Sequence, residues 1–271
     1  YGIYYHVAYW GNGPHLAEGC SPEKIQFSMN EALKSDSLYY CITNVSNVRP
    51  LHFSSEFNAK LLCGDTDIVS FAKEFYGRIF GDFGSIAAKG MEQYYKCFAD
   101  FGQSELIKRC EKHNFYYHDY GKTEFINYEG SDGKLKNGSY DTYKNETLMK
   151  ELKRSAGDFE RLCGYWEDNE CNVPETAREY YEIYQKFQTG YMLMLTKWNI
   201  AYNEMFLADT AEDTVKKGIE AQDCIRRILS ERKILENGCW QGWLSGEKKL
   251  NFEGLLEKTR EKSAELAAMR A

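Results

Sequence analysis

The first fifty residues predict a strand, a helix and a second strand in that order. This order restricts this part of the chain to a parallel sheet. Residues 1–10 are rich in aromatic and β-branched side chains and end at the Gly-Asn-Gly-Pro turn of residues 11–14. A capping Ser21 before Pro22 predicts a helix over 22–35. Residues 38–45 are too continuously apolar to leave one face of a strand in water. Ligands of such units bind beyond the carboxyl ends of the strands.

From Pro50 onward the apolar side chains recur at helical spacing. Asp65-Thr66-Asp67 predicts the start of a helix over 68–80, and Gly81 and Gly84 separate it from the next helix. Long helices connected by short links form antiparallel bundles. We therefore expect a bundle, with a short helix around 104–112 and longer helices over about 140–164, 174–208, 211–236 and from 252 to the end.

These two patterns predict a mainly α chain that divides near residue 64. Residues 1–64 form a partial α/β unit, and residues 65–271 form an antiparallel helical bundle domain. One strand-helix-strand unit cannot cover both faces of a sheet. We therefore expect the unit to belong to a larger barrel or sheet, with further strands preceding Tyr1.

Charge and apolar patterning exclude two classes of partner. Lys and Arg number 34 against 41 Asp and Glu, for a net charge of −7, so a broad nucleic-acid footprint is not expected. No apolar run approaches the roughly 20 residues that a membrane span requires. The 41 aromatic residues, which are 21 Tyr, 15 Phe and 5 Trp, suit either a sugar-binding cleft or a helical core.

The cysteines and histidines do not indicate a metal site or a cofactor. Nine cysteines are an odd number and include no Cys-x-x-Cys pair, so neither a disulfide framework nor a zinc ribbon is expected. His113 and His118 lie five positions apart, which does not place them on one helical face. We expect no metal and no cofactor. The compartment stays open between the cytoplasm and secretion from a bacterium.

Polar side chains gather where the two expected strands end. His6 and Tyr9 lie near the end of the first, and Asn44, Asn47 and Arg49 lie at the end of the second. In a parallel barrel the carboxyl ends of the strands share one face, so these residues would converge on a pocket. A structural role for the histidine is the alternative.

The same residues carry a family resemblance. Tyr4-Tyr5-His6-x-x-Tyr9, the Pro22-x-Lys24-Ile25 helix start and the segment Thr43 to Pro50 resemble the xylan α-glucuronidases of glycoside hydrolase family 115. The resemblance implies the end of a (β/α)₈ TIM barrel over about residues 1–60, followed by a helical bundle. Trp240-x-Gly-Trp243 is similar to a loop that closes this region.

The family activity that this resemblance implies is the inverting removal of 4-O-methylglucuronic acid from xylan. Such a reaction requires two carboxyl groups roughly 6.5–9.5 Å apart. The resemblance further implies that His6 and Tyr9 bind the sugar or its carboxylate, and that Asn44 positions hydroxyl groups or water. It also implies a carbohydrate substrate carrying glucuronic acid and an amino-terminal barrel half that precedes this segment.

Three positions depart from the family pattern. Ala8 and Asn47 replace the usual aspartates, and Arg49 replaces lysine, which changes the geometry offered to a carboxylate. We assign no acid and base in this segment; for Glu56 we expect a structural role. Either the acid and base come from earlier strands, or catalysis is altered or lost. The alternative function is a non-catalytic carbohydrate-binding or self-association module, for which a homodimer through the long helices is an ordinary arrangement.

Overall fold

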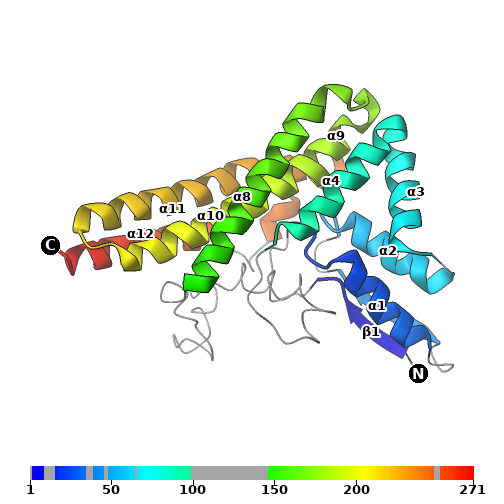
Figure 1. Ribbon diagram of the computed structural model, residues 1–271, viewed down its shortest axis with the longest axis horizontal. Coiled ribbons are helices and arrows are strands. Elements are labelled where there is room, and N and C mark those ends of the chain that lie inside the picture. Colours follow the sequence, from blue (N-terminus) through cyan, green and yellow to red (C-terminus); the bar gives the residue numbers. More distant parts are fainter. Residues whose placement is uncertain are drawn as a thin grey trace.

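A computed structural model describes the chain over residues 2–8, 16–34, 39–45, 48–64, 66–98, 146–246 and 251–271. It is mainly helical, as the sequence predicts, with one small parallel sheet beside helices α1 and α2 (Figure 1). The expected helix around 104–112 and the pair His113 and His118 lie outside the described residues. So do Tyr9 and Asn47.

The strand-helix-strand prediction is confirmed. Strand β1 (Gly2–His6) is followed by helix α1 (Pro22–Leu33) and strand β2 (Tyr40–Asn44). The strands pair in parallel from Gly2 opposite Tyr40 to His6 opposite Asn44. The helix begins where the capping pattern predicts, since the Ser21 hydroxyl accepts a hydrogen bond from the Lys24 backbone nitrogen at 3.2 Å.

The two faces of this sheet differ in what covers them. On the helix-covered face, the Tyr5 hydroxyl lies 3.7 Å from the Cys20 sulfur, and Asn58 donates to the Thr43 hydroxyl at 2.6 Å. The opposite face shows side chains that are 55–61% exposed, namely Tyr4, Tyr40 and Ile42. Because side chains alternate along a strand, His6 and Asn44 belong to this second face.

Three helices follow and pack through aromatic rings. They are α2 (His52–Cys63), α3 (Ile68–Phe80) and α4 (Gly84–Lys96), with a 3₁₀ turn at Gly81–Phe83 before the last. Asp67 caps α3 by accepting from the Ser70 backbone nitrogen at 2.9 Å, as predicted. Between α2 and α3, Phe53 and Phe57 meet Phe71 and Phe75 edge to face or tilted, with ring centroids 4.9–5.2 Å apart.

Four long helices form the remainder. They are α8 (Glu146–Asn169), α10 (Gln188–Leu207), α11 (Ala211–Glu231) and α12 (Phe252–Ala268). Figure 1 shows α10, α11 and α12 extending side by side while α8 crosses them. Helix α10 lies at the centre and is buried on nearly all sides, including the fully buried Trp198.

The connection from α8 to α10 is irregular. It passes through 3₁₀ turns at Glu170–Asn172 and Glu175–Ala177, helix α9 (Arg178–Tyr181) and a π-helical turn η5 (Glu182–Phe187). After α11 come further 3₁₀ turns at Arg232–Glu236, Gly238–Trp240 and Trp243–Gly246. These turns bring the second half of the chain against the first.

Buried apolar side chains form one cluster that extends from Tyr5 in β1 to Leu255 in α12. The expected domain division near residue 64 stays a prediction. None of the described helices combines the length and the apolar composition that a bilayer span requires.

Candidate functional site at the strand ends

His6 and Asn44 meet at the carboxyl edge of the sheet. They are register partners, and the Asn44 amide nitrogen lies 3.0 Å from Nδ1 of the imidazole. An amide nitrogen can only donate, so Nδ1 accepts and the neutral ring carries its proton on Nε2. The two strand ends therefore bring these two side chains together, while the shared sugar pocket stays a prediction.

Backbone and ring contacts fix the imidazole in this place. The backbone nitrogens of Val7 and Ala8 both donate to the Asn44 carbonyl, at 3.1 and 3.3 Å, which holds the chain against β2 beyond the last pair. The Tyr4 ring lies on the same face, with its centroid 4.4 Å from that of His6. These contacts hold the imidazole at the carboxyl edge of the sheet.

Arg49 is directed toward the second half of the chain. Its side chain is only 4% exposed, and Nη2 lies 3.4 Å from a carboxylate oxygen of Glu179. The guanidinium carbon lies 4.9 Å from the centroid of the Trp240 ring, and Trp240 packs edge to face on Trp243. This contact brings the loop that holds both tryptophans against the residues after β2.

The Arg49 contacts differ from the sequence expectation of a sugar-binding cation beside His6. Its Nε is buried and has no hydrogen-bond partner within the part of the chain that the structure describes. Arg49 places its delocalised guanidinium over the Trp240 ring, and the compact ammonium of a lysine would not reproduce this contact.

Two other expected positions have clear structural surroundings. Glu56 in α2 accepts from Arg78 in α3 at 2.7 and 2.8 Å, an ion pair between helices that supports the structural role expected for this acid. Ala8 is 3% exposed. A carboxylate at that buried position would require a charged or hydrogen-bonded partner.

Glu18 is a buried acid that the sequence did not single out. It is 2% exposed, and its carboxylate accepts hydrogen bonds from the backbone nitrogen of Ser54, at 3.1 Å, and from the Ser54 hydroxyl. Burial raises the pKa of this carboxyl from 4.5 to about 7, although the bonds from Ser54 oppose the rise. Its position in the segment Leu16-Ala17-Glu18-Gly19-Cys20, among small and apolar residues, is the only sequence sign of this burial.

The backbone around Glu18 connects the sheet region to the helices. Its nitrogen donates to the Gln188 side chain at 3.0 Å, and its carbonyl accepts from the Tyr94 hydroxyl at 2.7 Å. Gln188 donates in turn to the Pro50 carbonyl at 2.8 Å. Because both carboxylate oxygens are held by Ser54, Glu18 serves the packing between α2, α4 and α10 and is a poor candidate for an acid at the strand ends.

Metal binding has no support from the described ranges. Within them, no group of three or more His, Cys, Asp or Glu side chains is arranged to hold a metal ion. The described side chains at the strand ends are an imidazole, an amide and an aromatic ring, which are groups that bind neutral or anionic oxygen-rich ligands by hydrogen bonds and stacking.

Comparison with known proteins gives one match. No curated protein and no solved structure is similar enough to match the chain. The model of glycosyl hydrolase family 115 matches residues 1–106, a segment that contains both strands and helices α1 to α4. The family resemblance inferred from the motifs is thus confirmed over residues 1–106, which are similar to glycosyl hydrolase family 115.

Proposed function

We propose that this chain is part of an α-glucuronidase that removes glucuronic acid branches from xylan, and that it supplies one wall of the sugar pocket. The family match supports glycoside hydrolysis in general. The glucuronic acid substrate rests on the motif around His6 and on the segment from Thr43 to Pro50.

The observation that carries the proposal is the meeting of His6 and Asn44 at the carboxyl edge of two parallel strands. In (β/α)₈ barrels, the helices surround the sheet, and active sites lie at the carboxyl ends of the strands. His6 and Asn44 lie on the face that α1 and α2 do not cover, which corresponds to the interior of such a barrel.

The same face supports the expectation of further strands. Strands of parallel sheets are ordinarily covered on both faces. Here the uncovered face exposes Tyr4, Tyr40 and Ile42, each more than half accessible to solvent in the described part of the chain. We propose that additional strands of the same protein cover these side chains and complete the pocket.

The proposed chemistry assigns binding roles to this segment. In the inverting reaction, one carboxyl protonates the leaving glycosidic oxygen, while the other takes a proton from the attacking water. We propose that both carboxyls lie on the additional strands. His6 donates from Nε2 to a sugar hydroxyl or to the carboxylate of the uronic acid, and Asn44 keeps the ring in the tautomer that makes this possible. Tyr9 is a further proposed sugar ligand, outside the described residues.

The test is hydrolysis of glucuronoxylan by the full-length protein and by its His6→Ala variant. Losing a hydrogen bond to a charged group costs about 1.5–3 kcal/mol, so kcat/KM should fall about ten- to a hundredfold. His52→Ala is the matched control, because His52 lies in α2 and packs on Phe75 and Tyr180. Unchanged activity of the His6 variant would remove this residue from the site.

The alternative is a protein that binds carbohydrate, or associates with itself, without turnover. Ala8 and Asn47, which are neutral where the family pattern is acidic, favour this alternative. Binding of glucuronoxylan oligosaccharides by the full-length protein without release of uronic acid would support it. Sedimentation would then show whether the protein forms the homodimer that long amphipathic helices allow.

A further inference from the structure

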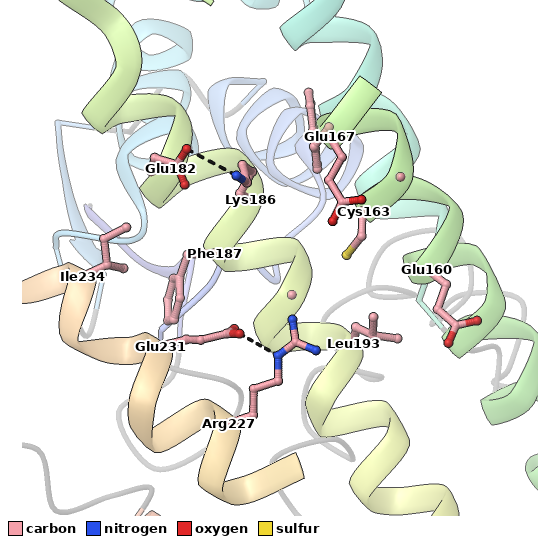
Figure 2. A pocket seen from close by; sticks show the side chains of 13 residues that line it. Glu160, Cys163, Glu167, Glu182, Lys186, Phe187, Leu193, Arg227, Glu231 and Ile234 are labelled. Carbon is pink, nitrogen blue, oxygen red and sulfur yellow. Dashed lines mark hydrogen bonds and ion pairs between the residues drawn. The ribbon is translucent and has the colours of Figure 1, made fainter. Parts of the chain in front are cut away.

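A cleft of about 560 Å³ lies among the helices of the second half of the chain. Helix α8, the π-helical turn η5 with the start of α10, and the end of α11 enclose it (Figure 2). Phe187, Leu193 and Ile234 give it an apolar lining. The volume lies within the range of about 300–1,000 Å³ that is typical of small-molecule sites.

Two glycines contribute to the hollow shape of this cleft. A Cβ at Gly164 in α8 would meet no atom within 4 Å, and one at Gly190 in α10 would meet only a Glu231 carboxylate oxygen at 3.6 Å. Glycine inside a helix is less favourable than alanine by about 0.5–1 kcal/mol. Close helix packing does not explain either glycine, because no neighbouring helix backbone occupies the space, and both positions open into the cleft.

The charged side chains of the cleft are mostly acidic. Its lining includes two cations, Lys186 and Arg227, and four glutamates, so the formal balance is 2 − 4 = −2; the glutamates are Glu160, Glu167, Glu182 and Glu231. Both cations are already paired within the protein. Arg227 lies 2.6 Å from Glu231, and Lys186 lies 2.9 Å from Glu170 and 3.4 Å from Glu182.

One carboxylate has no such partner. Among the described residues, no ion pair involves Glu167, which shares the α8 side of the cleft with Cys163 (Figure 2). The Cys163 thiol responds to the surrounding charge. Burial, with smaller contributions from Glu167, Glu231 and Glu160, raises its pKa to about 11, and Arg227 opposes this rise. This thiol therefore stays protonated near neutral pH and is not a nucleophile.

The backbone also departs from a regular helix at this place. Residues Glu182–Phe187 form a π-helical turn, which places Lys186 and Phe187 at the cleft. Such turns cost helix regularity and occur frequently at functional sites.

We propose that this cleft binds a small organic cation, an ammonium group carried on an apolar body of about ten non-hydrogen atoms. The apolar body contacts Phe187, Leu193 and the open faces of the two glycines. The ammonium lies toward Glu167, where the excess negative charge is not matched by a protein cation. An anionic ligand is disfavoured, because Lys186 and Arg227 would have to leave their present carboxylates to bind it.

The test is calorimetric titration of the full-length protein with 2-phenylethylammonium, and with 3-phenylpropionate as an anionic ligand of similar size. We expect the ammonium compound to bind at least tenfold more tightly than the carboxylate. Equal affinity for the two compounds, or no binding of the ammonium compound up to about 10 mM, would overturn the proposal.

Variants locate the binding. Gly190→Leu fills the cleft and should weaken binding at least tenfold, and Gly164→Leu does the same from α8 if the first variant fails to fold. Glu167→Gln should weaken binding about threefold, as expected for a partly screened charge pair. Glu175→Gln, which removes an exposed charge outside the cleft, should leave affinity unchanged. Affinity that neither leucine alters would show that the cation binds elsewhere and would refute the site.

Discussion

The raised pKa of Glu18 predicts how the free energy of unfolding changes with pH. Burial raises the pKa of this carboxyl from 4.5 to about 7 in the folded protein. The difference, 7 − 4.5 = 2.5, at 1.36 kcal/mol per pH unit, corresponds to about 3 kcal/mol. The folded state binds the proton more tightly than the unfolded state, so the free energy of unfolding falls as pH rises from 4.5 to 7 and stays lower above that.

The variant Glu18→Gln isolates this effect, because glutamine resembles the protonated acid in shape and stays neutral. We expect the variant to be more stable than the unaltered protein at pH 8.5, by up to about 3 kcal/mol. At pH 4.5 this advantage should disappear. Urea denaturation across this pH range measures the free energy of unfolding of both proteins.

The difference between the two pH curves is the quantity to compare. Burial lowers the pKa of His52 below 6.5, which makes stability rise with pH through that window, opposite in sign to the effect of Glu18. His52 is common to both proteins, so its contribution cancels in the difference. A flat difference between Glu18→Gln and the unaltered protein would refute the assignment of a raised pKa to this carboxyl.

Three substitutions test the packing. A Cβ at Gly90 would overlap the ring of the buried Trp166, so Gly90→Ala should lower the free energy of unfolding by about 1–3 kcal/mol in urea denaturation. Gly164→Ala, where the added carbon meets nothing, should instead raise it by about 0.5–1 kcal/mol; a loss would contradict the open geometry. Arg49→Lys removes the guanidinium from the face of Trp240 and should lower the free energy of unfolding by about 1 kcal/mol. An unchanged denaturation midpoint would show that this contact does not stabilise the fold.

Helix starts that are set by residues close together in the sequence are predictable from it. Ser21 and Asp67 cap α1 and α3 where the pattern predicts, because a capping side chain bonds to a backbone nitrogen three residues away. The helix α2 was not predicted as a separate element, since Leu51 before it offers no capping side chain. Its position follows from the packing of Phe53 and Phe57 against α3.

The candidate site was predictable only in part. The meeting of His6 and Asn44 follows from parallel pairing, which the order of strand, helix and strand already implies. The direction in which Arg49 points does not follow from the strand order, because its partners Glu179 and Trp240 lie more than a hundred residues further along the chain. The burial of Glu18 is not predictable from the sequence, because only folding brings its partners Ser54 and Gln188 to it.

The central claim is that the imidazole of His6 binds a uronic acid at the strand ends. The most direct measurement is a crystal structure of the full-length protein soaked with glucuronic acid. We expect an oxygen of the sugar at about 3 Å from Nε2 of His6, with the bond between Asn44 and Nδ1 retained. A sugar bound away from β1 and β2, or a His6 imidazole sealed from the ligand by other strands, would contradict this account.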